Sequence, residues 1–231
     1  MDFGNITTNI IKRGLVFNMD AANRASYPRT GTTATDTIGN TSSTLNGTTF
    51  ISTTGSGIFD FDGVDDYINT GTIDLGTKNS ISYWFNQGLD GNTQAIIGSP
   101  DGGNYYITYS TYNYIHFSPN GSSPVFYSPY RNPRPPFNFP GAWGNYLITR
   151  NDNTLNVFVN GEKINISGTG TITGNTRVNM IGARILSDNP INYANGSIGP
   201  IHMYNRALSA NEVLHNYNAL KGRFGLWNSG Q

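Results

Sequence analysis

NGSIGPIHMYNRALSANEVLHNYNAL, residues 195–220, joins a strand pattern to a helix pattern. We expect a strand over residues 197–205, followed by a short turn and the start of a helix. Ser209 and Glu212 have the spacing of a capping box, in which the two side chains accept hydrogen bonds from backbone amides at the helix start. Because only one narrow face of this predicted helix is apolar, the helix requires a surface on which to lie.

The limits of this helix are also marked in the sequence. Leu208 before the cap and Val213 after it can form a hydrophobic staple. Gly222 follows the last apolar position and predicts the end of the helix. The apolar positions at helical spacing are Val213, Leu214, Tyr217 and Leu220.

Short runs that alternate between apolar and polar residues predict strands in most of the remaining chain. The expected strands cover residues 14–20, 49–61, 67 onward, 80–86, 94–98, 104–110, 113–118, 143–150, 153–160, 162–166 and 176–183, whereas residues 21–49 are expected to form a loop. About twelve strands at short spacing with one late helix predict an all-β fold. We expect a two-sheet antiparallel jelly-roll sandwich with one short C-terminal helix.

Composition limits the possible partners. The chain has 231 residues, which suffices for one large β domain. Charged residues are 12% of the sequence and the formal net charge is zero. We therefore expect neither nucleic acid nor an anionic membrane as a partner, since both require a basic face.

The sequence also indicates the compartment. There is no cysteine, so disulfides and thiolate metal sites are excluded. The N-terminal stretch MDFGNITTNIIKRG lacks the apolar core of a signal peptide, and no apolar run reaches membrane-spanning length. We expect a soluble protein that reaches its destination without a Sec-type export signal.

One segment, residues 119–141, stands apart because it contains seven of the eleven prolines together with several aromatic residues. Such a stretch is not expected to pair as a central strand, so it predicts an ordered excursion or a mobile loop. The predicted organisation is an N-terminal arm (residues 1–13), one domain (14–223) that includes this loop, and a C-terminal tail (224–231). The arm is expected either to pair with the domain, to tether it, or to fray.

Four stretches in order resemble the concanavalin A-like, laminin-G-like jelly rolls. They are FDGVDDYI (61–68), SISYWF (80–85), LITRNDNTLNVFVNGE (147–162) and IHMYNRALSANEV (201–213). The resemblance covers residues 14 to about 222 and implies the sandwich fold. An Asp-Glu pair that is common in the family just before IHMY is Gly199-Pro200 here, which weakens any transfer of acidic ligand chemistry.

Two stretches have a narrower resemblance, to virion proteins of tailed bacteriophages. They are GLVFNMDAANRASYP (14–28) and YNRALSANEVLHNYNALKGRFG (204–225). This resemblance implies a non-enzymatic capsid decoration, tail fibre or other accessory protein. The implied partners are other virion proteins of the capsid or tail, or a second copy of the chain. The implied location is the virion surface, after assembly in the host cytoplasm.

Asp60, Asp62 and Asp65 imitate the paired carboxylates of glycoside hydrolases on related sandwiches. Alternate strand positions place two carboxyl groups about 7 Å apart, near the separation that glycosidases use. All three acids are Asp, Asp65 lies in the turn rather than on the strand, and the same letters belong to the FDGVDD turn (61–66) of the family, where Asp side chains are expected to bond turn amides. Glu162 lies in a predicted hairpin turn and Glu212 in the helix cap. We therefore expect no enzymatic activity, and glycoside hydrolysis is the remote alternative.

The histidines and the possible calcium ligands match no recognisable catalytic or metal-binding motif. His202 is expected to face outward from its strand and His215 to lie on the helix surface, neither with a visible partner. Calcium ligands could converge at Asp20, Asp101 and Asn104, but turn-forming roles are favoured for them. We expect no metal and no cofactor.

An aromatic cluster is the candidate binding surface. It comprises Tyr112, Tyr114, His116, Tyr127, Tyr130 and Arg131. Flat aromatic faces with a cationic rim suit a saccharide, which makes a carbohydrate-binding module for host or environmental polysaccharide the alternative function. Aromatic residues and arginine are also enriched in protein interfaces, and the sequence favours the interface with neighbouring virion proteins.

Overall fold

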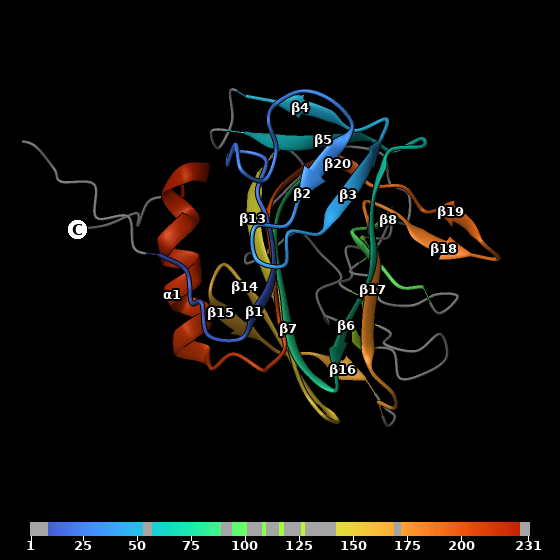
Figure 1. The fold of residues 1–231 in the computed structure, drawn as a ribbon. Helices are drawn as coiled ribbons and strands as arrows, with labels where there is room; N and C mark the ends of the chain where they lie inside the picture. The colour runs from blue at the N-terminus through green and yellow to red at the C-terminus, as the bar shows by residue number, and fades with distance from the viewer. Residues whose placement is uncertain are drawn as a thin grey trace, which may run out of the picture.

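The computed structural model describes residues 9–52, 57–88, 94–100, 108–109, 116–117, 126–127, 142–168 and 172–226. Two main antiparallel sheets lie face to face, and the helix α1 (Ala210–Leu220) packs on the outer face of the larger one. Figure 1 shows α1 on the left beside the larger sheet, with β6 and β17 of the smaller sheet on the right. The predicted two-sheet sandwich with a short C-terminal helix is thereby confirmed.

The larger sheet has eight strands. Its order is β15 (Glu162–Ile164), β14 (Thr154–Val159), β13 (Trp143–Asn151), β7 (Lys78–Gln87), β20 (Asn195–Tyr204), β5 (Ile58–Asp62) and β4 (Thr49–Ile51). The eighth strand, β1 (Leu15–Met19), pairs with the C-terminal half of β20, whose N-terminal half pairs with β5. The long strand β20 therefore joins the two ends of the chain.

The smaller sheet has five strands in the order β2 (Thr33–Thr35), β3 (Ser42–Asn46), β6 (Tyr67–Gly76), β17 (Thr176–Ile181) and β9 (Ile97–Gly98). Three minor sheets complete the strands: β10 (Thr108–Tyr109) with β8 (Gln94–Ala95); β11 (His116–Phe117), β12 (Phe126–Tyr127) and β16 (Ser167–Gly168); and β18 (Arg184–Leu186) with β19 (Asn189–Ile191).

Strand β7 shows how alternation builds the sandwich. Ile81, Tyr83 and Phe85 point into the core between the sheets. Trp84 points to the opposite face and is nevertheless fully buried, because aromatic residues near the C-terminal end of α1 cover it. An alternating strand covered on both faces, as the sequence predicted, is confirmed.

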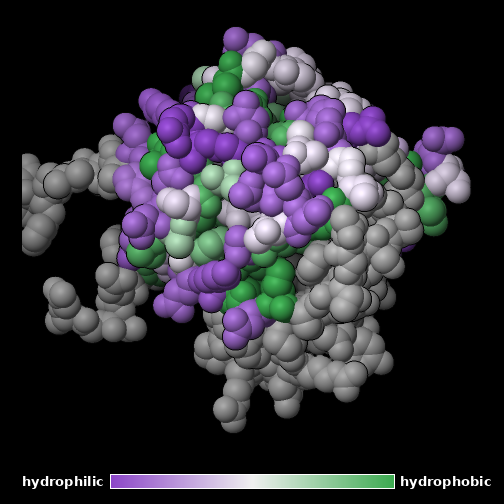
Figure 2. Space-filling model, turned by 90° about the horizontal axis from the view of Figure 1, so that it is seen from below, coloured by the Kyte–Doolittle hydropathy of each residue, from purple (hydrophilic) through white to green (hydrophobic). Residues whose placement is uncertain are grey.

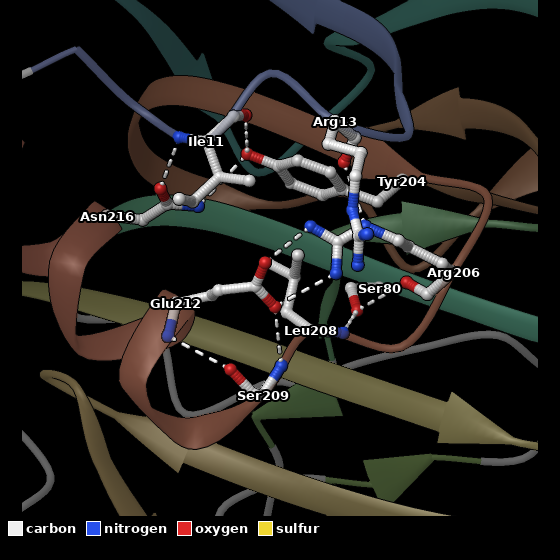
Figure 3. A network of polar contacts seen from close by, with 9 residues as sticks. All are labelled: Ile11, Arg13, Ser80, Tyr204, Arg206, Leu208, Ser209, Glu212 and Asn216. Atoms are coloured by element: carbon white, nitrogen blue, oxygen red, sulfur yellow. Dashed lines mark hydrogen bonds and ion pairs between the residues drawn. The ribbon is translucent and has the colours of Figure 1, made fainter.

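The start of α1 agrees with the sequence prediction. Ser209 and Glu212 form the capping box, and Leu208 and Val213 are both buried in one cluster beneath the helix. Figure 3 shows Glu212 also paired with Arg206, whose two terminal nitrogens lie 2.7 and 2.9 Å from the carboxylate oxygens. The ion pair and the backbone amide of Ser209 lower the pKa of Glu212 to about 2.

The apolar face and the end of the helix differ from the prediction. Leu214, predicted to lie on the buried face of the helix, is 43% exposed. The polar Asn216 is buried on that face instead. The chain continues beyond Gly222 as a 3-10 helix, η1 (Lys221–Phe224), and the left-handed residue that ends it is Gly225. Asn216 is tolerated inside because its amide donates to the hydroxyl of Tyr204 and accepts from the amide of Ile11.

Residues on both sides of the predicted domain pack against it. The part of the predicted arm that the structure describes lies against α1, where the carbonyl of Ile11 accepts a hydrogen bond from Tyr204 (Figure 3). Phe224, assigned to the tail, is 7% exposed and stacks on Trp84 with ring centroids 4.3 Å apart. Packing therefore includes residues from both sides of the predicted boundaries.

Three strand assignments also need correction. The predicted loop 21–49 contains β2 and β3, whose inward residues Ala34 and Ser43 are too small or too polar to produce an apolar alternation. The predicted strand 49–61 is divided into β4 and β5. Within the proline-rich segment, the two-residue strand β12 pairs on both sides, which is possible because its residues are not prolines.

Figure 2 shows one face of the molecule, coloured by the hydropathy of each residue. In Figure 2 hydrophilic residues cover most of the described part of this face, and hydrophobic residues show between them in small groups. Within the described ranges no helix is long and apolar enough to cross a membrane.

Candidate functional site

The aromatic cluster predicted from the sequence falls mostly outside the described residues. Tyr112, Tyr114, Tyr130 and Arg131 are not described, and for His116 and Tyr127 the structure gives the backbone alone. Their strands pair so that His116 lies directly opposite Tyr127. The cluster therefore stays a prediction.

The FDGVDD turn between β5 and β6 has the structural role predicted for it. One carboxylate oxygen of Asp62 accepts hydrogen bonds from the amides of Val64 and Asp65, at 2.7 and 3.4 Å. Asp60 accepts from the hydroxyl of Ser197 at 2.6 Å. The aspartates that imitated a catalytic pair thus bind groups of their own fold.

Asp66 is the buried member of this turn. Its carboxylate accepts from the amide of Asp62 at 2.9 Å and lies where a side chain on Gly47 would collide with it. Burial raises the pKa of Asp66, and the negative charges of the neighbouring aspartates add to the increase. Carboxylate oxygens of Asp62, Asp65 and Asp66 lie within 4.8 Å of one another, but those of Asp62 and Asp66 already accept backbone hydrogen bonds.

The other calcium candidate that the structure describes is Asp20. Both of its oxygens pair with the guanidinium of Arg223, at 2.7 and 3.0 Å, so it binds a cation of the protein itself. Asp101 and Asn104 lie outside the described residues.

The outer face of the smaller sheet carries a row of uncharged polar residues, which we call the polar face. Thr33 lies opposite Thr44, which in turn lies opposite Asn69. Two residues further along β3, Asn46 lies opposite Tyr67. These residues point away from the core because the intervening residues of β3 and β6 point into it. All five are exposed or half-buried.

A second tyrosine extends the polar face. The ring centroids of Tyr67 and Tyr193 are 6.4 Å apart, with an interplanar angle of 36°. The hydroxyl of Tyr193 donates to the carbonyl of Pro190 at 2.9 Å, which holds the ring after the hairpin β18–β19. Burial raises the pKa of Tyr193, with smaller contributions from Tyr67 and the charge of Asp65.

Two neighbouring aromatic rings beside hydroxyl and amide side chains are suited to a hydroxyl-rich ligand. The rings offer apolar faces for stacking, and Thr44 and Asn69 offer donors and acceptors. Sequence reasoning did not single out Tyr67 and Tyr193, which are far apart in the chain. The sequence feature that could have pointed to Tyr67 as a site residue is its position at the start of an alternating strand, beside an Asp-rich turn.

The structure explains why Gly199-Pro200 stands where the family commonly has an Asp-Glu pair. A side chain on Gly199 would lie 2.9 Å from the ring of Phe224 and 3.0 Å from Cβ of Trp84. The aromatic cluster under η1 therefore occupies the space in which an acidic side chain would stand. Apolar side chains fill the fold at this position.

Comparison with known proteins agrees with the sandwich fold. The model of the concanavalin A-like lectin/glucanases superfamily matches residues 62–214. A search of curated proteins finds no match to the sequence.

Several solved structures share the fold at low sequence identity. Domain 4 of an extracellular arabinanase from Geobacillus stearothermophilus, in complex with arabinotriose, is 16% identical with a TM-score of 0.59, and the match covers 91% of this chain and 100% of that domain. A Trypanosoma rangeli sialidase in complex with 2,3-difluorosialic acid is 14% identical (TM-score 0.67), covering 92% of this chain and 33% of the sialidase. The binding domain of botulinum neurotoxin serotype D is 13% identical (TM-score 0.57), covering 89% and 51%.

Proposed function

Because the chain belongs to the concanavalin A-like lectin/glucanases superfamily, we propose that it is a non-catalytic carbohydrate-binding module whose saccharide lies across Tyr67 and Tyr193 on the polar face. The observation that carries the proposal is this pair of neighbouring rings beside the uncharged Thr and Asn residues of an exposed sheet face. Stacking on the rings supplies apolar contact, and the amide of Asn69 and the hydroxyl of Thr44 supply polar contacts.

The comparisons support a binding role at the level of the whole domain. The arabinanase domain, which the match covers completely, was solved with arabinotriose. The chain spans only about one third of the sialidases that it matches. A catalytic role is further disfavoured by the acids beside the polar face, because their oxygens bond backbone amides of a tight turn.

A glycan array with the purified protein tests the proposal. We expect specific hits whose affinity falls about tenfold in Tyr67→Ala and in Tyr193→Ala, since each change removes a stacking face. Tyr67→Phe is the matched control, because it keeps the ring and should retain binding. Hits that all these variants bind as the wild type does would refute the polar face as the site.

The same array distinguishes the predicted aromatic cluster. Loss of the hits in Tyr114→Ala and Tyr130→Ala, with binding unchanged in Tyr67→Ala, would assign the saccharide to the predicted cluster instead. Hydrolysis of a β-glucan that disappears in Asp62→Asn would refute the non-catalytic role.

A second proposal concerns where the module works: on the particle of a tailed bacteriophage, as a decoration, fibre or other accessory protein. The specific observation is that the two phage-like stretches, far apart in sequence, form one unit. Leu15 of β1 lies opposite Tyr204 of β20, Asp20 pairs with Arg223, and the amide of Asn205 donates to the carbonyl of Gly14. These contacts make a shared structural unit out of the residues that carry the resemblance.

Mass spectrometry of density-purified particles tests this location. We expect the chain to remain with the particles after a high-salt wash, bound to capsid or tail proteins or to a second copy. A chain that is found in the lysate and is absent from washed particles would refute the virion role without affecting the saccharide proposal.

A further inference from the structure

The Asp-rich turn between β5 and β6 lies directly beside the segment that carries the second tyrosine of the polar face. Asn195, two residues after Tyr193, lies opposite Asp62 in the register of β20 and β5. Its side-chain amide donates to the carbonyl of Asp62 at 3.3 Å. A Cβ on Gly63 would lie 2.9 Å from Cβ of Asn195. The turn and the segment that follows Tyr193 are therefore in contact.

Asp65 lies on the same side of the turn as Tyr67. Asp65 is exposed and Tyr67 is half-buried, whereas Asp66 between them is buried. Because successive residues of an extended chain point to opposite sides, Asp65 projects towards the side on which the tyrosine rings lie. Burial raises the pKa of Tyr193, and the charges of Tyr67 and Asp65 add to the increase. The charge of Asp65 therefore reaches the second ring as well.

The carboxylate of Asp65 differs from the others of the turn in its hydrogen bonding. Asp62 accepts from the amides of Val64 and Asp65. Asp66 accepts from the amide of Asp62. None of the described residues donates a hydrogen bond to the carboxylate of Asp65. Since it is exposed and serves no contact of the described fold, it is accessible to a ligand on the neighbouring rings.

The charged groups around the two rings are mainly negative. The turn carries Asp62 and Asp65, both exposed, and the buried Asp66. The hairpin β18–β19 carries the exposed Asp188 and the half-buried Arg184, whose Nε donates to a neighbouring side-chain oxygen at 2.7 Å. The described residues of these two elements thus place several carboxylates and a single guanidinium beside the rings. A ligand that lies across the rings meets a predominantly negative surface.

We propose that Asp65 is a specificity-determining residue, which restricts the polar face to saccharides without negative charge. A carboxylate, sulfate or phosphate group on a sugar would be repelled when the sugar stacks on Tyr67 or Tyr193. A neutral sugar instead supplies hydroxyl groups that donate to the carboxylate of Asp65. This specificity rests on the proposed function, because it requires a saccharide that lies across the two rings.

Pairs of saccharides that differ only in charge test this role. The glycan array includes such pairs, among them tetragalacturonate with its methyl ester and sulfated lactose with lactose. Titration calorimetry then compares the neutral and anionic form of each hit in the wild type, Asp65→Asn and Glu162→Gln. Glu162→Gln is the matched control, because it also removes one exposed negative charge but lies on β15 of the larger sheet.

We expect the wild type to bind the neutral form about fivefold more tightly than the anionic form, which is the effect of one unit charge near contact distance in water. Asp65→Asn should remove most of this difference, and Glu162→Gln should leave it as in the wild type. The difference should also shrink in about 1 M salt, because salt screens exposed charges. The midpoint of urea unfolding of Asp65→Asn should equal that of the wild type, since no described group bonds to this carboxylate.

The double variant Tyr67→Ala/Tyr193→Ala separates this role from the saccharide site itself. Suppose that the double variant loses the hits, but the wild type binds both forms equally or prefers the anionic form. This result overturns the role of Asp65 and leaves the polar face in place, as does a preference that Asp65→Asn retains or that Glu162→Gln reduces equally. An array without hits, or hits that the double variant keeps, overturns the polar face and the role of Asp65 with it.

Discussion

Buried His202 should make this protein sensitive to mild acid. The residue lies on β20 on the face toward α1 and is 3% exposed. Burial lowers its pKa to about 4, against a partial opposing effect of Asp20, while Arg223 lowers it further. The sequence predicted an outward-facing histidine, and the structure agrees on the face but covers the side chain.

The sign and size of the effect follow from the difference in pKa between the folded and unfolded chains. His202 is neutral in the folded protein, whereas the unfolded chain binds a proton below pH 6.5. Its contribution to stability is therefore complete above pH 6.5 and is lost as the pH falls towards 4. Each unit of difference in pKa corresponds to about 1.36 kcal/mol, so the free energy of unfolding falls by about 3 kcal/mol between pH 6.5 and pH 4. Glu212, with its pKa lowered to about 2, loses its contribution only below pH 4.5.

Urea unfolding between pH 7.5 and pH 4.5 measures this loss directly. We expect the free energy of unfolding of the wild type to fall across this interval, and His202→Gln to remove most of the fall. His215→Gln is the control for replacing a histidine elsewhere in the chain, since His215 lies on α1 with its ring nitrogen beside the carbonyl of Asn9. A flat wild-type profile, or an unchanged slope in His202→Gln, would refute the reasoning.

Three further changes test the packing of the chain ends by thermal or urea unfolding. Gly199→Ala should destabilise by about 1–3 kcal/mol through overpacking against Phe224, and stability equal to the wild type would contradict the close contact. Truncation after residue 223 should cost about 3–5 kcal/mol, because it removes Phe224 from Trp84; an unchanged midpoint would restore the boundary predicted from the sequence. Ser209→Ala should cost about 1 kcal/mol by removing the cap, with Ser209→Thr as the control that keeps it.

Features that depend on residues close in the chain were predictable from the sequence. The capping box needs only residues three apart, and the structure forms it as predicted. The hairpin at Asn160-Gly161 needs two left-handed residues, and both have positive φ, 52° and 81°. The alternation of β7 identified its two faces because large side chains make the period visible.

Strands that bury small or polar residues, and contacts between residues far apart in the sequence, were not predictable in this way. Strands β2 and β3 bury small or polar residues such as Ala34 and Ser43, so their pattern resembles that of a loop. Tyr67 and Tyr193 meet only because the β5–β6 turn and the β18–β19 hairpin lie side by side. The burial of Phe224 depends on the absence of a side chain at Gly199, which no local rule reveals.

The sequence by itself thus determined the strands with large alternating side chains, the helix start and the sandwich class, because hydrogen bonding and burial of neighbours along the chain are local. Only the tertiary structure decided that Asp20 pairs with Arg223, that His202 is covered, and that the buried oxygen of Asn86 has no donor among the described residues. Each of these depends on which distant segments the register of β20 brings together, and register is a property of the whole sheet.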